Sequence, residues 1–176
     1  MTLKKIEEFS LEDALDLAIQ IELEAMERYQ EFARQIGTIS EFDAGAFFLE
    51  MANNENKHAA ELMSKKLALF GNTTCKFTIE EYYDFLEIEA PEFDKAESFM
   101  SAEQALLVAR ASEIKAFQFF DKVSKLTNNL EVKKLFLELR QEEEMHRKMI
   151  ETMLEKVEKG TDQLRSGDDI DEPNGL

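Results

Sequence analysis

FFLEMANNENKH at residues 47–58 and LFLELRQEEEMH at residues 135–146 decide the fold, because each stretch ends in a glutamate followed three residues later by a histidine. A second pair of stretches aligns in the same way, AIQIELEAMERY at 18–29 with ARASEIKAFQFF at 109–120. The two copies of the Glu-x-x-His stretch are separated by three residues fewer than the two copies of the other stretch. The sequence therefore predicts a duplicated helical hairpin whose second copy has the shorter inner loop.

Apolar residues recur at helical spacing in four long segments, expected at residues 10–36, 40–70, 101–126 and 131–159. Capping boxes support three of the starts: Ser10 with Asp13, Ser40 with Asp43, and Ser101 with Gln104. Gly37 and Gly71 follow two of the predicted ends, where a glycine readily adopts the conformation that terminates a helix. With only 2 Pro and 6 Gly in 176 residues, few positions interrupt these helices.

The two hairpins predict an all-α four-helix bundle formed by residues 1–160, in which a long crossover connection at residues 72–100 joins the hairpins. Within the connection a short helix is expected from Ile79 to about Ile88, because it begins with a capping box and ends before a proline. Residues 161–176 lose helical periodicity, which predicts a flexible acidic tail.

Composition and charge exclude several classes of function. The formal net charge is −17, and such a field repels nucleic-acid phosphates and anionic membrane surfaces while it attracts cations. No apolar stretch approaches the ~20 residues of a membrane span, and the opening MTLKKIEEFSLED does not have the pattern of a signal peptide. Cys75 is the only cysteine, which excludes an intramolecular disulfide and any metal site built on four cysteines. We therefore expect a cytoplasmic protein that binds neither nucleic acid nor membrane.

The residues that carry chemistry are four glutamates and two histidines: Glu22, Glu55, His58, Glu113, Glu143 and His146. A spacing of three residues places each Glu-x-x-His pair on one helix face. At a rise of about 1.5 Å per residue, Glu22 and Glu55 stand at the same height about the first predicted turn, as Glu113 and Glu143 do about the second. Each of these glutamates interrupts an apolar stripe that should face the core.

Four carboxylates that converge in an apolar bundle would cost several kcal/mol each if they stayed unpaired. Protonation relieves that cost, and so do two divalent cations, whose charge four carboxylates balance. A pair of metal ions explains the spacing, the burial and the duplication together. The alternative is a metal-free helical interaction module in which the six residues are incidental, since a single Glu on a helix is usually at the surface.

A Glu from each of two helices plus a Glu-x-x-His from each of the other two resembles the site of ferritin-like di-iron proteins. The chain is identified as a member of their rubrerythrin branch over residues 10–159, on four motifs: Glu22-x-x-Ala25-x-x-x-Tyr29, Glu55-x-x-His58, Glu113-x-x-Ala116 and Glu143-x-x-His146. The resemblance implies a ferritin-like fold that holds two iron ions, with manganese or zinc as alternatives. It implies that Glu55 and Glu143 bridge the ions, while Glu22 with His58 and Glu113 with His146 complete the two sites. By the same resemblance Tyr29 donates a hydrogen bond to a ligand.

Three departures from the rubrerythrin pattern matter. A single cysteine cannot build the rubredoxin domain that typical rubrerythrins append, so electrons have to come from an external donor, a rubredoxin-like protein or a flavoprotein. Ala116 stands where rubrerythrins carry an additional glutamate one turn after the third-helix ligand, which brings the set closer to that of bacterioferritin. Asn56 stands where bacterioferritin has its haem-ligating methionine, so no haem is expected.

The resemblance implies a non-haem di-iron oxidoreductase that reduces H2O2, or O2, and serves in oxidative stress. Two alternatives stay open at this point: a ferroxidase or iron-buffering and storage protein without a dedicated electron donor, and a dimanganese catalase with a similar ligand set. A homodimer is the expected assembly.

Overall fold

Helices make up all the regular structure of the described part of this chain. A computed structural model describes residues 6–37, 44–76 and 101–167, and of residues 160–167 the backbone alone. It contains a short 3-10 helix and four long α-helices: η1 (Ile6–Glu8), α1 (Leu11–Ile36), α2 (Ala44–Phe70), α4 (Ala102–Leu126) and α5 (Leu130–Gly167). The described residues form no strand, which confirms the predicted fold class. None of their helices combines the length and the apolar composition that a membrane crossing requires.

Reciprocal capping boxes start two of the helices, as predicted. The Ser10 hydroxyl accepts the Asp13 N–H at 3.2 Å, and the Asp13 carboxylate accepts the Ser10 N–H at 3.0 Å, at the start of α1. Ser101 and Gln104 form the same pair of bonds at the start of α4. Each box satisfies N–H groups that the first turn of a helix otherwise leaves without a partner.

Glycines end the two helices of the first hairpin. Gly37 and Gly71 have φ angles of 80° and 73°, a region in which a residue with a β-carbon is strained. Their N–H groups donate to the last turns of α1 and α2 at 2.9 Å, which confirms the predicted ends. The predicted start at Ser40 with Asp43 and the short helix at 79–88 lie outside the described residues.

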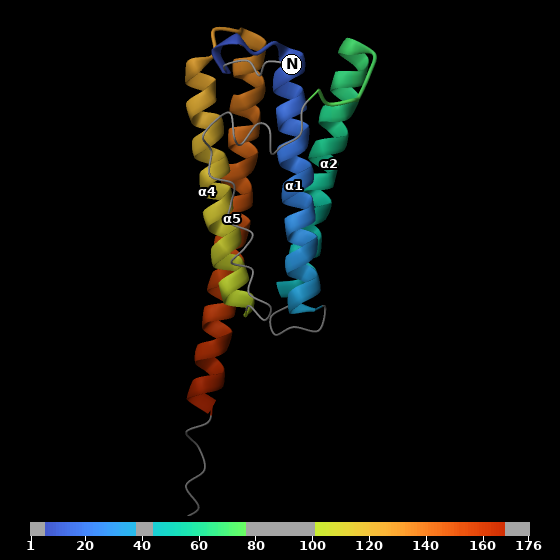
Figure 1. Ribbon diagram of the computed structural model, residues 1–176. Coiled ribbons are helices and arrows are strands. Elements are labelled where there is room, and N and C mark those ends of the chain that lie inside the picture. Colours follow the sequence, from blue (N-terminus) through green and yellow to red (C-terminus); the bar gives the residue numbers. More distant parts are fainter. Residues whose placement is uncertain (1–5, 38–43, 77–100, 168–176) are drawn as a thin grey trace, which may run out of the picture.

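The fourth helix is longer than predicted. It continues to Gly167 instead of ending near Lys159, so the first part of the predicted tail, residues 161–167, is helical. The apolar periodicity does stop near Lys159, but a helix already formed adds residues at little cost, and one glycine at position 160 costs only about 1 kcal/mol. In Figure 1 this end of α5 runs past the other three helices. Residues 168–176 lie outside the described part.

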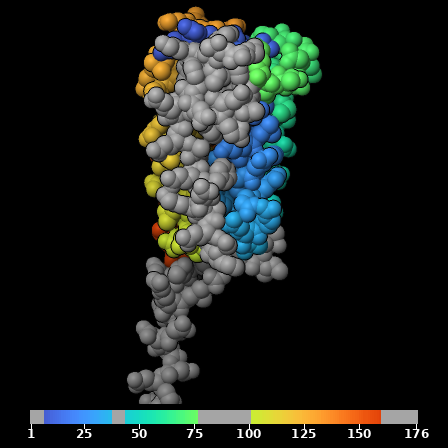
Figure 2. Space-filling model, viewed as in Figure 1, coloured from blue at the N-terminus to red at the C-terminus, as the bar shows by residue number. Residues whose placement is uncertain are grey.

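The four long helices form two antiparallel hairpins, in which α1 packs along α2 and α4 packs along α5. The end of α2 and the start of α4 lie at opposite ends of the bundle (Figure 1). Of the predicted crossover at 72–100, residues 77–100 lie outside the described part of the chain. In the space-filling view α4 and α1 face the viewer, and the end of α2 stands at the upper right (Figure 2). This topology brings the middle sections of the four long helices to about the same level of the bundle (Figure 1).

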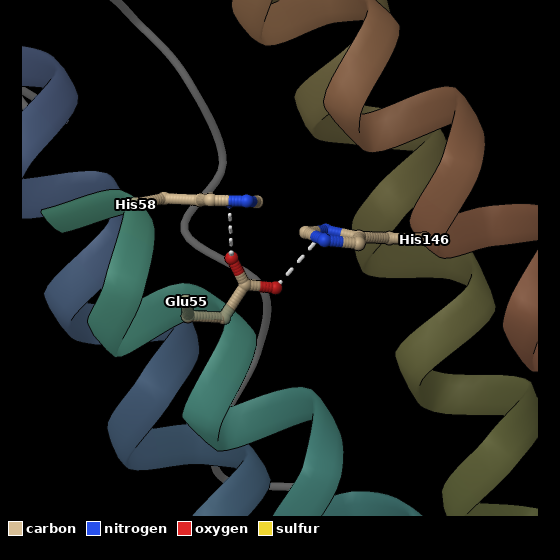
Figure 3. Close-up of side chains that lie close together, drawn as sticks. All are labelled: Glu55, His58 and His146. Carbon is tan, nitrogen blue, oxygen red and sulfur yellow. Dashed lines mark ion pairs between the residues drawn. The ribbon is translucent and has the colours of Figure 1, made fainter. Parts of the chain in front are cut away.

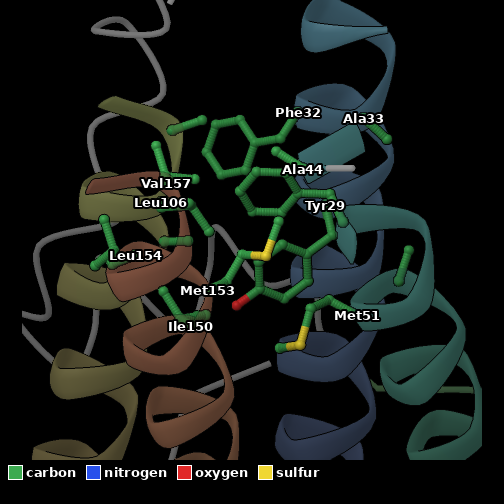
Figure 4. Close-up of a cluster of buried hydrophobic side chains, with 14 residues drawn as sticks. Tyr29, Phe32, Ala33, Ala44, Met51, Leu106, Ile150, Met153, Leu154 and Val157 are labelled. Atoms are coloured by element: carbon green, nitrogen blue, oxygen red, sulfur yellow. The ribbon is translucent and has the colours of Figure 1, made fainter. Parts of the chain in front are cut away.

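Two apolar clusters fill the bundle, one on each side of its middle. The first gathers buried side chains from the start of α1, the end of α4 and the start of α5, among them Leu15, Phe120 and Phe136. The second gathers side chains from the end of α1, the start of α2 and α4, and the later part of α5, among them Tyr29 and Met51 (Figure 4). The polar residues between them are therefore closed off from water above and below.

A buried ion pair that the sequence analysis missed joins the helices of the first hairpin. Asp16 on α1 and Lys66 on α2 are both 0% exposed, and their charged groups are in contact. Lys66 Nζ also donates to the carbonyl oxygen of Thr74 at 2.6 Å, and the N–H of Lys76 donates to Asp16 Oδ2 at 3.1 Å. The pair thereby ties the segment after α2 to both helices.

Candidate metal centre

The six predicted residues meet at the middle of the bundle, between the two apolar clusters. They come from all four long helices: Glu22 from α1, Glu55 and His58 from α2, Glu113 from α4, and Glu143 and His146 from α5. Five of them are buried. His58 is the exception, with 22% of its side chain exposed against 5% for His146.

Glu55 lies between the two histidines (Figure 3). One of its carboxylate oxygens is 3.6 Å from His58 Nδ1, and the other is 3.0 Å from His146 Nδ1. The imidazole rings are nearly parallel, with centroids 5.3 Å apart and an angle of 14° between their planes. A carboxylate that reaches both rings has the position from which it could bridge two cations.

The remaining glutamates divide between the two histidines. Glu22 Oε2 is 3.7 Å from His58 Nδ1, whereas Glu113 and Glu143 each have an oxygen 3.8 Å from His146 Nδ1. Three sets of side chains have candidate ligand atoms that all lie within 4.8 Å of one another: Glu55–His58–His146, Glu22–His58–Glu142 and Glu113–Glu143–His146. The structure therefore brings together all six residues that the sequence singled out. Their role as metal ligands stays a prediction.

Tyr29 and its counterpart in the second hairpin, Phe120, differ in their ability to donate a hydrogen bond, as the sequence suggested. The Tyr29 hydroxyl donates a hydrogen bond to Glu113 Oε1, across the bundle from α1 to α4. Phe120 occupies the matching place, is fully buried and has no donor. The glutamate of the His146 side therefore accepts a hydrogen bond from a tyrosine, whereas the position that matches Tyr29 has no hydroxyl to offer Glu22.

Unsatisfied polar atoms show whether the centre suits a cation. Glu55 Oε1, His58 Nδ1 and His146 Nδ1 are buried, and among the described residues they form ion-pair contacts but no hydrogen bond. Buried polar atoms without partners are costly and uncommon, and these three point at one small region. Carboxylate oxygens with imidazole nitrogens form a donor set that binds iron, manganese or zinc. The residues present therefore fit a pair of such ions.

Without metal, the centre holds protons instead. Contacts with Glu22 and Glu55 raise the pKa of His58 to about 10. Burial alone would lower the pKa of His146, but the carboxylates around it dominate and raise it to about 11. Burial raises the pKa values of Glu22 and Glu113 well above 4.5. Burial also acts to raise the pKa of Glu55, yet the two histidines outweigh it and lower that pKa to about 2.

These shifts predict that the metal-free protein loses stability as pH rises above neutrality. For His58 and His146 the folded pKa exceeds the ordinary 6.5, so their contribution is complete below pH 6.5 and is lost towards pH 10–11. The raised pKa values of Glu22 and Glu113 act in the same direction, whereas Glu55 stabilises the fold above pH 4.5 and stops doing so only towards pH 2. We expect the Tm of chelated protein to fall from pH 6.5 to pH 10. A Tm that rises over this interval would contradict the proton-filled centre.

Glu142 belongs to the centre although the sequence analysis did not select it. It is half-buried, and one of its oxygens lies near those of Glu22 and near a nitrogen of His58. Burial raises its pKa. The Glu-x-x-His rule chose Glu143, three residues before His146, whereas Glu142 stands four before it. Spacing by four also defines one helix face, so that signal was present in the sequence.

Comparisons with known proteins agree with this architecture. The family model described as Rubrerythrin matches residues 13–105 and 104–172, one segment for each hairpin. A similar solved structure is that of an uncharacterized conserved protein from Magnetospirillum magnetotacticum MS-1, a crystal structure at 2.00 Å resolution. It is 26% identical, covers 84% of this chain and 95% of its own, and superposes with a TM-score of 0.69. No curated protein matches the sequence.

Proposed function

Because the chain belongs to the rubrerythrin family, we propose that it is a non-haem di-iron oxidoreductase that reduces H2O2 with electrons from an external donor. One observation carries the proposal: four glutamates and two histidines from four helices converge between apolar clusters, and three of their buried polar atoms form no hydrogen bond with the described residues. A protonated His146 can pair with Glu55 at 3.0 Å, but His58 Nδ1 is 3.6 Å from Glu55 and 3.7 Å from Glu22, and two cations would satisfy all three atoms.

The proposed reaction balances in electrons and protons. H2O2 takes up two electrons and two protons to give two molecules of water, and a pair of bound Fe(II) ions would supply one electron each. An external reductant, a rubredoxin-like protein or a flavoprotein, would then return two electrons to the centre. We propose a homodimer as the working assembly.

The chain's own residues have three tasks in this scheme. The four glutamates of the centre would hold the cations together with the two histidines and balance their charge. The Tyr29 hydroxyl keeps the Glu113 carboxyl in one orientation, which preserves the geometry of that ligand during turnover. The apolar clusters on both sides exclude bulk water and so limit the escape of partly reduced oxygen.

A ferroxidase or iron-buffering role is the second candidate, and Ala116 favours it. This residue packs against the first apolar cluster at the position where the resemblance leads one to expect an additional carboxylate. Without such a carboxylate from α4, the six predicted residues are closer to the ligand set of bacterioferritin, as the sequence resemblance indicated. A dimanganese catalase is distinguished from both by its metal content.

The choice of oxidant separates the two candidates. We expect the protein loaded with Fe(II) to react faster with H2O2 than with O2, because a two-electron oxidant matches the two electrons that the pair supplies. The measurement is single-turnover stopped-flow absorbance at equal concentrations of each oxidant, after metal analysis of the purified protein. Tyr29→Phe should slow the H2O2 phase, while Thr152→Val, which removes an exposed hydroxyl that donates to the Lys148 carbonyl oxygen, serves as the control. Equal or faster reaction with O2 would assign the ferroxidase role.

A further inference from the structure

The two sides of the centre differ in their access to solvent. On the His146 side, the imidazole is 5% exposed and Tyr29 holds Glu113 by a hydrogen bond. On the other side His58 is 22% exposed and lines a cavity of about 140 Å³ between α2 and α5, together with Glu142. The cavity therefore connects one half of the centre with the surface, and the other half is enclosed.

The lining of this cavity is predominantly negative. Glu61 on α2 and Glu138 and Glu142 on α5 contribute three carboxylates, and Lys65 contributes the single ammonium group. Leucines from both helices form the rest of the wall. A concave surface with apolar walls and excess negative charge concentrates cations, since the low-dielectric walls focus the field.

Glu142 stands at the inner end of the cavity. Its nearest oxygen, one oxygen of the buried Glu22 and one nitrogen of His58 all lie within 4.8 Å of one another. His58 Nδ1 is itself a buried atom without a hydrogen-bond partner, and Glu142 makes no hydrogen bond within the part of the chain that the structure describes. Glu142 precedes Glu143 by one residue, which corresponds to a rotation of about 100° around α5. This rotation turns the Glu142 side chain towards α2.

The duplication does not repeat this carboxylate. Glu142 aligns with Asn54 in the first hairpin, so the sequence repeat carries an amide at the position that matches this carboxylate. Glu142 brings the His58 side to two carboxylates besides Glu55, the number that Glu113 and Glu143 give the His146 side, so the two halves differ in their access to solvent.

The geometry points to Glu142 as a further metal ligand, which binds the cation of the His58 side at the inner end of a cation route through this cavity. The inference rests on the proposed function, because it presupposes the metal centre. An ion that enters between α2 and α5 meets Glu142 together with His58 before it reaches the enclosed half. The His58 side is then the exchangeable site, and the His146 side retains its ion longer.

Binding of Co2+ alone to the metal-free full chain tests this assignment without any turnover. Titration followed by the visible spectrum and by calorimetry should resolve two ions per chain, one per side by analogy with paired sites. Glu142→Gln should weaken one of them by roughly tenfold or more, as losses at metal sites commonly do, and leave the other unchanged. Glu142→Asp keeps the carboxylate and should recover part of the affinity. Glu144→Gln removes the same charge from a residue paired with Arg147 at 2.8 Å and should bind like the native chain.

Association rates test the route. Glu61→Gln/Glu138→Gln should slow Co2+ uptake several-fold at low salt, and the difference should shrink at high salt because screening shortens the reach of these charges. Native affinities and uptake in Glu142→Gln would overturn the inference while leaving the metal centre intact. A native chain that binds no Co2+ would overturn the proposed function, and the inference with it. Selective weakening of one ion in Glu142→Gln, with Glu144→Gln unaffected, is the result that we expect.

Discussion

Replacing Glu55 and Glu143 together by glutamine is expected to abolish tight metal binding. Glu55 contacts both histidines, so its loss affects both sides of the centre, and Glu143 is one of the three groups around His146. Glutamine preserves the shape but removes the charge, which leaves the cations without compensation in a buried site. The loss should exceed the roughly 10- to 100-fold that removal of an outer hydrogen-bond partner costs. Metal analysis after dialysis should find about two ions per native chain and far fewer in the variant.

The control for this experiment is Glu50→Gln/Glu144→Gln, which makes the same charge change on the same two helices. Glu50 is exposed, and Glu144 pairs with Arg147 outside the centre. This variant should retain the native metal content. Full occupancy in Glu55→Gln/Glu143→Gln would exclude these residues as ligands, and a metal-free native protein would favour the helical interaction module.

Replacing Lys66 by methionine should cause the largest loss of stability. The substitution leaves Asp16, which is fully buried, without the ammonium group that compensates its charge. Removing one partner of a buried ion pair typically costs about 3–5 kcal/mol. We expect the free energy of unfolding, from urea denaturation of metal-free protein, to fall by about that amount.

A double replacement separates the ion pair from the space it fills. Asp16→Leu/Lys66→Met removes both charges and keeps the site apolar, so its loss should be well below that of Lys66→Met alone. Lys57→Met removes an exposed charge from the same helix and should change stability by less than about 0.5 kcal/mol. A Lys66→Met variant as stable as the Lys57→Met control would show that the pair contributes nothing.

Local signals along the chain determined the secondary structure and the choice of residues for the centre. Capping boxes at Ser10 and Ser101 and glycines at 37 and 71 give the helix ends because they act within one turn, where a sequence can be read directly. Duplication and helical spacing were sufficient to select the six residues of the centre. These residues recur at helical spacing, so they share a face of each helix. Their distances from the turns then set their positions along the bundle axis.

Tertiary structure alone decided which side chains approach one another across helices. The pairing of Asp16 with Lys66, the bond from Tyr29 to Glu113 and the place of Glu142 beside His58 all join distant positions of the chain. Such contacts depend on the rotation of each helix about its axis and on the spacing between hairpins, and packing of the two apolar clusters determines both. Helical periodicity predicts which face of a helix turns towards the core, but it does not predict which side chains of the other helices this face contacts. The difference between an open and an enclosed half of the centre therefore emerges only in the folded bundle.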